Sequence, residues 1–318
     1  MQRLRLLVAA FCTLACAHAA AQYPNRPIRL VVPFAAGGAA EVGCRALAQA
    51  LSQSLGQPVV VEAKPGADGQ LAGAEIMRAA PDGYTLFNGT ASGLSYVPAV
   101  RKTPYDPIAD FTPVSTFYVA SFFLYVHPSV PAKSMAELVE YLRANPGKVA
   151  FGTAASTAMM ASIELMANTK TQTIQVSYKG EAVAVPDLLT GRVQLMFATP
   201  LAGLQHTKDG KLRALVTTAP QRSPLFPDVP TLPEAGLPEL SVMSWGGIFG
   251  PPRMPKEIVV RLSREIALAL KRPEVLEQIQ RTGLSVRGSP PEELAAVVKQ
   301  QLEVWRRAVR EGKVAPQE

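Results

Sequence analysis

The stretch IRLVVPFAAGGAAEV, residues 28–42, indicates the class of fold. An apolar run ends at a proline, two glycines (Gly37 and Gly38) turn the chain, and small residues lead into Glu41–Leu55. In that segment apolar side chains recur at helical spacing, and Gly56 follows as a stop signal. We therefore predict a strand, a glycine turn and a helix. Such a turn can hold a phosphate, a carboxylate or nothing.

The same order of elements repeats along the chain. Strands are expected at Pro58–Glu62 and Tyr84–Asn88, with a helix at Leu71–Ala80 between them, which predicts a parallel sheet with right-handed crossovers. Further strands are expected at Val114–His127, Val149–Gly152, Ile174–Ser177, Gln194–Ala198, Leu212–Thr217 and Ser241–Phe249. Further helices are expected from the capping box at Ser134 to Leu142, at Thr157–Asn168, Val183–Thr190, Lys256–Lys271 and Pro273–Thr282, and from a second capping box at Ser289 to about Glu311.

The first residues have the pattern of a secretory signal peptide. Arg3 and Arg5 form a basic start, Leu6–Ala17 is apolar, and small residues follow. Cleavage is expected after Ala21, with Ala19 as the alternative. The mature protein is therefore expected in the periplasm.

The mature chain is long enough for two lobes. Long helices at the end of a chain usually pack on a lobe that is already built. We therefore predict a first lobe made of residues 22–121 and 243–318 and a second lobe made of residues 122–242. Two strands, near Tyr118–Phe122 and Val242–Gly246, are expected to connect them.

Composition and motifs argue against several classes of protein. The net charge is +7, but the basic residues are scattered, so nucleic acid is not an expected partner. Once the signal peptide is removed only Cys44 remains, which excludes an internal disulfide. His127 and His206 have no partners at metal-ligand spacing, so no metal is expected.

Catalytic motifs are also missing. The serine hydrolase pattern fails because Ala91 occupies the nucleophile position in GTASG, residues 89–93. The sequence contains no GxGxxG and no phosphate-binding P-loop, so no cofactor is expected. We therefore predict a protein that is not an enzyme.

Four small polar turns follow predicted strands, at Pro33–Ala40, Gly89–Ser95, Thr153–Thr157 and Tyr178–Ala182. Each opens at a helix N-terminus, where unpaired N–H groups and the helix dipole favour an anion. Any one of them can equally be a tight connection. Together, in two lobes that face each other, they predict a binding cleft.

These residues resemble a known family. The matching stretches are YPNRPI (23–28), VVPF with GG (31–38), APDGYTL (80–86), PYDP with DF (104–111), ANPGK (144–148), YKG (178–180), GKLRAL (210–215), RSP with PDVPT (222–231), EAGLP (234–238) and SWG (244–246). The chain resembles the extracytoplasmic solute-binding receptors of the tripartite tricarboxylate transporter family, also called the Bug family. The resemblance implies an α/β, two-lobed periplasmic-binding-protein fold of type II, with the ligand cleft between the lobes.

The resemblance also implies a function and a site. The receptor is expected to be a monomer that captures a small organic carboxylate by lobe closure and delivers it to transporter membrane subunits. The loop after the first strand is expected to hold one carboxylate, with help from both lobes. The residues implied by this likeness are Phe34, Ala35, Gly37, Gly38, Ala39, Glu41, Thr90, Ser92, Ala155, Ser156, Thr157 and Ala198.

Several positions depart from the family pattern. Ala39-Ala40-Glu41 replaces Ser-Thr-Asp, and Ala198-Thr199 replaces Asp-Asn. Loss of that Asp makes an amino-acid ligand less expected. Methionines and alanines indicate a pocket for a ligand with an aliphatic or aromatic body. Met159 and Met160 either line this pocket or pack in the core.

Two other functions stay open at this stage. A receptor of this fold can dock on a sensor-kinase ectodomain instead of a transporter, and an exported enzyme can share the fold. The sequence alone does not identify the carboxylate.

Overall fold

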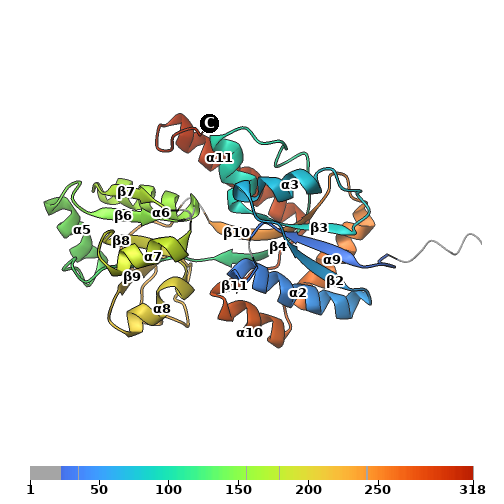
Figure 1. Ribbon diagram of the computed structural model, residues 1–318, viewed down its shortest axis with the longest axis horizontal. Helices are drawn as coiled ribbons and strands as arrows, with labels where there is room; N and C mark the ends of the chain where they lie inside the picture. Colours follow the sequence, from blue (N-terminus) through green and yellow to red (C-terminus); the bar gives the residue numbers. More distant parts are fainter. Residues whose placement is uncertain (1–22, 35, 155, 179, 241–242, 318) are drawn as a thin grey trace, which may run out of the picture.

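The computed structural model describes residues 23–34, 36–154, 156–178, 180–240 and 243–317. Its strands form a six-stranded and a five-stranded sheet that lie side by side along the long axis of the molecule (Figure 1). Ala35 and Ala155, two predicted site residues, and the expected signal peptide lie outside the described residues. None of the helices in the described part of the chain is both long and apolar enough to cross a bilayer.

The six-stranded sheet has the order β11-β4-β10-β3-β1-β2. β1 pairs in parallel with β2 and β3, as predicted, whereas β10 lies antiparallel between β3 and β4. Its strands are β1 (Ile28–Val32), β2 (Val59–Ala63), β3 (Thr85–Thr90), β4 (Thr112–Ala120), β10 (Ser244–Gly250) and β11 (Leu284–Val286). The carboxyl ends of β1 and β3 therefore meet at one edge.

The five-stranded sheet has the order β7-β6-β8-β5-β9. β6 pairs in parallel with β7 and β8, and β5 runs antiparallel to β8 and β9. Its strands are β5 (Phe123–Val126), β6 (Ala150–Thr153), β7 (Ile174–Ser177), β8 (Leu195–Ala198) and β9 (Arg213–Thr217). The segment Val114–His127, predicted as strand from its β-branched and aromatic residues, thus contains most of β4 and all of β5, which belong to different sheets.

Helices flank both sheets. Those of the first sheet are α2 (Ala39–Leu55), η1 (Ala67–Gly69), α3 (Gln70–Ile76), η2 (Ser92–Tyr96), α4 (Val97–Val100), α9 (Lys256–Ala269), α10 (Pro273–Arg281) and α11 (Pro291–Arg310). Those of the second sheet are α5 (Met135–Ala144), α6 (Ser156–Thr169), α7 (Glu181–Leu189) and α8 (Pro200–Lys208). α11 lies against η2, α4 and β4.

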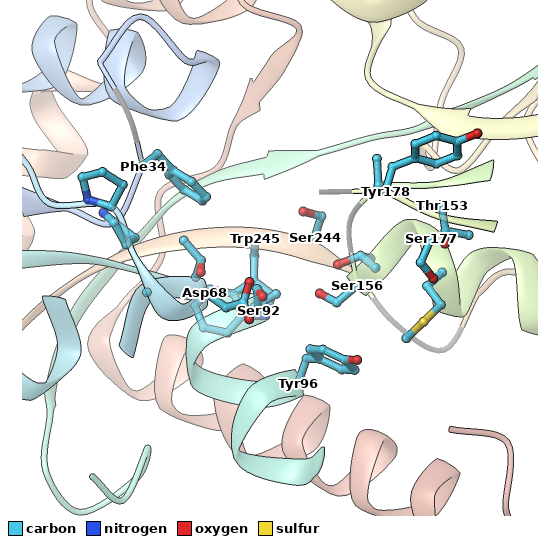
Figure 2. Close-up of a pocket in the computed structure, with 18 of the residues that line it drawn as sticks. Phe34, Asp68, Ser92, Tyr96, Thr153, Ser156, Ser177, Tyr178, Ser244 and Trp245 are labelled. Atoms are coloured by element: carbon cyan, nitrogen blue, oxygen red, sulfur yellow. The ribbon is translucent and has the colours of Figure 1, made fainter. Parts of the chain in front are cut away.

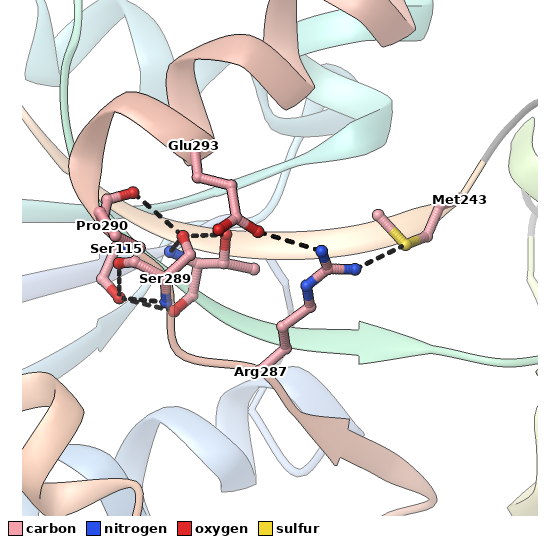
Figure 3. Close-up of polar contacts among 7 residues, drawn as sticks. Ser115, Met243, Arg287, Ser289, Pro290 and Glu293 are labelled. Atoms are coloured by element: carbon pink, nitrogen blue, oxygen red, sulfur yellow. Dashed lines mark hydrogen bonds and ion pairs between the residues drawn. The ribbon is translucent and has the colours of Figure 1, made fainter. Parts of the chain in front are cut away.

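The helix N-cap predicted at Ser134 is confirmed, with the Glu137 carboxylate accepting from Lys133 N at 2.8 Å, and the N-cap predicted at Ser289 is wrong. Ser134 Oγ accepts a hydrogen bond from Glu137 N at 3.2 Å and caps α5. Ser289 does not cap α11, because the N-cap is Pro290 and the Ser289 hydroxyl is used elsewhere. Ser289 Oγ accepts from Thr116 N at 3.1 Å, so it ties the start of α11 to β4 (Figure 3).

Each sheet has a hydrophobic core of its own. Leu47 and Leu262 are fully buried beside the six-stranded sheet, and Phe151 and Phe197 beside the five-stranded one. The molecule therefore has the predicted two-lobed α/β fold. The exact lobe boundaries stay a prediction, since residues 241–242 are not described.

Candidate functional site

A cleft of about 570 Å³ lies between the two sheets (Figure 2). The first-sheet side is lined by Pro33, Phe34, Pro65, Gly66, Asp68, Gly69, Thr90, Ala91, Ser92, Tyr96, Tyr118, Ser244, Trp245 and Gln317. The second-sheet side is lined by Thr153, Ala154, Ser156, Thr157, Met159, Ser177 and Tyr178. The predicted residues Phe34, Thr90, Ser92, Ser156 and Thr157 thus lie together.

Thr90, the last residue of β3, and Ser92, the first residue of η2, line the cleft. Thr90 Oγ1 accepts from Gly93 N at 3.3 Å, and Tyr105 Oη donates to Gly93 O at 2.8 Å. These bonds fix the start of a helical segment that begins with the π-helical turn η2 and continues as α4. The first N–H groups of such a segment lack partners within the helix, so they suit an anion.

The loop between β2 and α3 is conformationally strained where it lines the cleft. Four consecutive residues have positive φ: Gly66 (138°), Ala67 (46°), Asp68 (54°) and Gly69 (92°). Side chains rarely adopt this region, and such strain gathers at functional sites. Asp68 Oδ2 is held by Arg101 at 2.7 Å.

The diglycine bend is held by its own helix. Gly37 has φ 85°, and its N–H donates to Glu41 Oε2 at 3.0 Å. Glu41 is buried and also forms an ion pair with Arg45. Neither glycine, nor Ala39 or Glu41, is among the residues that line the cleft, whereas Phe34 is. Their contact with a ligand stays a prediction.

The second wall begins where β6 ends. Tyr178 N donates to Thr153 O at 2.8 Å, which holds the ends of β7 and β6 together. The Tyr178 hydroxyl donates to Asp187 Oδ2 at 2.9 Å. Burial, and then this bond, raise the pKa of Tyr178 above 10.0, so the phenol keeps its proton. The ring is therefore fixed at its outer end.

The two methionines left open by the sequence take different positions. Met159 lines the cleft. Met160 is buried in a cluster with Tyr96 and Trp305, where α6 meets η2 and α11. Met159 thus faces the cleft and also packs against this cluster, and Met160 is buried within it.

Ala198 is fully buried in the core of the second lobe and does not line the cleft. Next to it, Thr199 donates from its N–H and its hydroxyl to Glu181, at 2.8 and 2.6 Å. Burial is the main reason why the pKa of Glu181 is raised above 4.5, against the opposing effect of Thr199. The contact of Ala198 with a ligand stays a prediction.

The floor of the cleft is made by β4 and β10. Tyr118 and Trp245 line it, and Trp245 Nε1 has no hydrogen-bond partner among the described residues although the side chain is only 1% exposed. A buried donor without a partner costs about 1–3 kcal/mol, so an acceptor placed here would be favoured. Asp68 is the only charged side chain among the described lining residues, so neutral donors dominate.

The sequence missed several lining residues. Trp245 and Tyr178 lie within the SWG and YKG stretches, which carried a usable signal. Asp68, Tyr96 and Gln317 carried none. Gln317 reaches the cleft because its N–H donates to Val100 O and its Nε2 donates to the Tyr96 hydroxyl, both at 2.8 Å.

The described part of the chain contains no cluster of metal-ligand side chains. No three His, Cys, Asp or Glu side chains there are grouped so that they could hold a metal ion. His127 Nδ1 lies 2.8 Å from Ser129 Oγ, outside the cleft.

Comparison with known proteins decides the family. Residues 44–313 match the model of the "Tripartite tricarboxylate transporter family receptor". The chain belongs to the tripartite tricarboxylate transporter receptor family. It is similar to protein BugT of Bordetella pertussis, with 35% identity over 296 residues that cover 91% of this chain and 90% of BugT. A protein from the tcbD-tcbE intergenic region of Pseudomonas sp. strain P51 is also 35% identical, over 91% of this chain and 87% of its own.

Solved structures of family receptors have the same fold. BugD, a periplasmic binding protein, is 33% identical with a TM-score of 0.76, over 93% of this chain and 100% of BugD. Rpa4515 of R. palustris, solved with adipate, is 30% identical with a TM-score of 0.80, over 93% and 100%. MatC of Rhodopseudomonas palustris, solved with malate, is 31% identical with a TM-score of 0.74, over 90% and 100%. The predicted family and fold are thus confirmed, and these family receptors bind solutes.

Proposed function

We propose that this family receptor captures a small organic carboxylate in the periplasm and delivers it to the membrane subunits of a tripartite tricarboxylate-type transporter. One observation carries the proposal: the cleft lies between the two sheets and is lined from both by hydroxyl groups close to helix starts. Adipate and malate in the solved family receptors support a carboxylate as the solute.

The proposed mechanism is closure of two lobes about the segments that join them. The carboxylate first meets donors of the open first lobe, with Thr90 and Ser92 as contacts. Closure then brings Ser156 and Thr157 to the solute and excludes water. The diglycine bend, Gly37–Gly38, is a further proposed contact through N–H groups that Glu41 does not use.

Hydrogen bonds to the carboxylate can supply the binding free energy that such a receptor needs. Each hydrogen bond to a charged group contributes about 1.5–3 kcal/mol. A few of them match a dissociation constant near 1 μM, which corresponds to about 8.2 kcal/mol. The cleft therefore needs no cationic side chain to hold one carboxylate.

A ligand screen tests the binding function. Aliphatic and aromatic mono-, di- and tricarboxylates are added to the purified protein, and melting temperature, radius of gyration and calorimetric affinity are measured. A true solute should raise the melting temperature and lower the radius of gyration. Because a solute at 100 times its dissociation constant stabilises by about 2.7 kcal/mol, the shift should be plain.

Matched variants tie the effect to the cleft. Ser92→Ala and Ser156→Ala should each lower the affinity for the solute by about tenfold or more, since each removes a hydrogen-bond donor to a charged group. The control is Ser54→Ala, because Ser54 lies on the exposed side of α2 and should leave affinity unchanged. If no acid in the panel binds, or if all three variants bind alike, the proposed site is wrong.

Delivery to a transporter needs its own measurement. Uptake of the radiolabelled solute is measured in cells that make the membrane subunits with and without this receptor. We expect uptake only when the receptor is present. If uptake is equal in both strains while the purified protein still binds the solute, the protein does not deliver the solute to this transporter and serves another partner.

A further inference from the structure

Two aromatic side chains face the cleft from opposite lobes. Phe34 follows β1, lines the cleft and is 40% exposed, so its ring is accessible to a solute. Tyr178 follows β7 and lines the other wall. Figure 2 shows the two side chains on opposite sides of the cavity. Lobe closure is the movement that brings such walls together.

Tyr178 is built to present one side of its ring. The hydroxyl is fixed to Asp187 Oδ2 at 2.9 Å, and the backbone N–H is fixed to Thr153 O at 2.8 Å. The ring lies against Gly152, where an added Cβ would come within 3.5 Å of Tyr178 Cε2. That separation is ordinary van der Waals contact, so the ring packs beside β6.

The rest of the lining favours dispersion and neutral donors over ion pairs. Tyr96, Tyr118 and Trp245 also line the cleft but are only 8%, 4% and 1% exposed, so they present little ring surface, whereas the half-buried Met159 adds a polarisable thioether. Among the described lining residues Asp68 alone is charged, and it is acidic. A solute with a large apolar body gains more in this cleft than one that depends on several charges.

From these observations, and resting on the proposed function, we infer that the preferred solute is an aromatic carboxylate whose ring lies between Phe34 and Tyr178 in the closed protein. The acid group takes the donors near Ser92 and Ser156. A flat ring fits between two ring faces in offset or edge-to-face contact, whereas a saturated ring is thicker and lacks the matching quadrupole. The inference differs from the aliphatic acids bound by Rpa4515 and MatC.

Pairs of acids that differ only in aromaticity test this inference on the unmodified protein. Benzoate is compared with cyclohexanecarboxylate, phenylacetate with cyclohexylacetate, and adipate serves as an aliphatic reference. Within at least one pair we expect the aromatic acid to bind about five- to tenfold more tightly by calorimetry.

Variants assign the preference to the two rings. Phe34→Leu and Tyr178→Leu should reduce the aromatic preference to about twofold or less, because they keep apolar volume but remove the ring. Phe34→Tyr and Tyr178→Phe keep the ring and should keep the preference. Circular dichroism and melting curves show whether each variant is folded.

The outcomes separate this inference from the function on which it rests. Tighter binding of aromatic acids, lost only in the leucine variants, supports the inference. If adipate or a saturated acid binds and neither aromatic acid binds more tightly, the solute class is wrong and the receptor function stands. If none of these five acids binds but another aliphatic carboxylate of the broader panel does, the aromatic inference is wrong and the receptor function stands; if no acid of the broader panel binds, the proposed function fails as well.

Discussion

Gly37 and Gly38 stand side by side in the first bend but have opposite backbone requirements. Gly37 has φ 85°, in the left-handed region, whereas Gly38 has φ −74° and ψ 156°, which any residue adopts. The sequence identified both glycines as a turn. It did not indicate that Glu41, one helical turn later, would accept the Gly37 N–H, because that bond depends on a side-chain conformation.

Gly37→Ala should therefore destabilise the protein and Gly38→Ala should not. An added Cβ at Gly37 meets no atom within 4 Å, so the penalty comes from the left-handed backbone, about 1–2 kcal/mol. For Gly38→Ala we expect a change within about 0.5 kcal/mol. Urea unfolding measures both free energies. Equal losses in the two variants would contradict this account of the bend.

At the scale of elements, sequence patterns located the strands well. β1 and β7 have the predicted bounds, and α2 begins two residues before the predicted Glu41. Both strands have apolar or β-branched residues between clear turn signals. Hydrophobic periodicity and helix- or strand-breaking residues are therefore sufficient to locate an element that buries one continuous face.

Other elements lacked such a signal. α8 begins at Pro200 and contains Gly203, whose place is set by packing, since an added Cβ would meet the Tyr125 ring at 2.2 Å. The sequence pattern predicts no helix between the strands expected at Gln194–Ala198 and Leu212–Thr217. η2 was read as part of a loop, and β11 has only three residues. These elements depend on tertiary contacts that a local pattern does not contain.

An ion-pair cluster joins β1, β2 and α3. Glu75 of α3 pairs with Lys64, next to β2, and with Arg29 of β1 at 2.9 Å. The hydrogen bond from Lys64 is the main reason why the pKa of the Glu75 carboxyl is lowered below 4.5. The folded state therefore favours the ionised form. Its stabilisation is fully present above the ordinary pKa of 4.5 and is lost as the pH falls through the lowered value.

Glu75→Gln should thus lower the free energy of unfolding at pH 7 and change it little at strongly acidic pH. Because the cluster is partly exposed, the expected loss at pH 7 is at most about 1 kcal/mol. The control is Glu140→Gln on α5, an exposed carboxylate that has no ion pair among the described residues. Denaturant titrations at several pH values measure the difference. A loss that is independent of pH would exclude the ion pairs as its cause.

At the scale of the whole molecule, the sequence predicted two lobes and the turns that face each other across the cleft. Phe34, Ser92 and Ser156 lie on its walls. The floor was harder to predict, because Trp245 and Tyr118 come from β10 and β4, and their pairing is set by the sheet. Gln317 reaches the cleft only through contacts far away in sequence.

Cys44 reports on the integrity of the first lobe. Its side chain is fully buried in the core, and burial raises the pKa of the thiol well above 9.0. In a chain with Cys12 and Cys16 replaced by serine, a thiol reagent at pH 8 should label Cys44 at least about a thousandfold more slowly than in urea, because labelling requires unfolding. Rapid labelling without urea would show local opening near α2.

The place of β10 between β3 and β4 has a consequence for the order of events during synthesis. All five strands of the other sheet are encoded between β4 and β10, so a ribosome completes that sheet first. Until residue 250 emerges, β3 and β4 lack the neighbour they share, and their unpaired edges are open to chaperones. The first lobe of the nascent chain therefore cannot complete its sheet until late in translation, after the whole second sheet has been made.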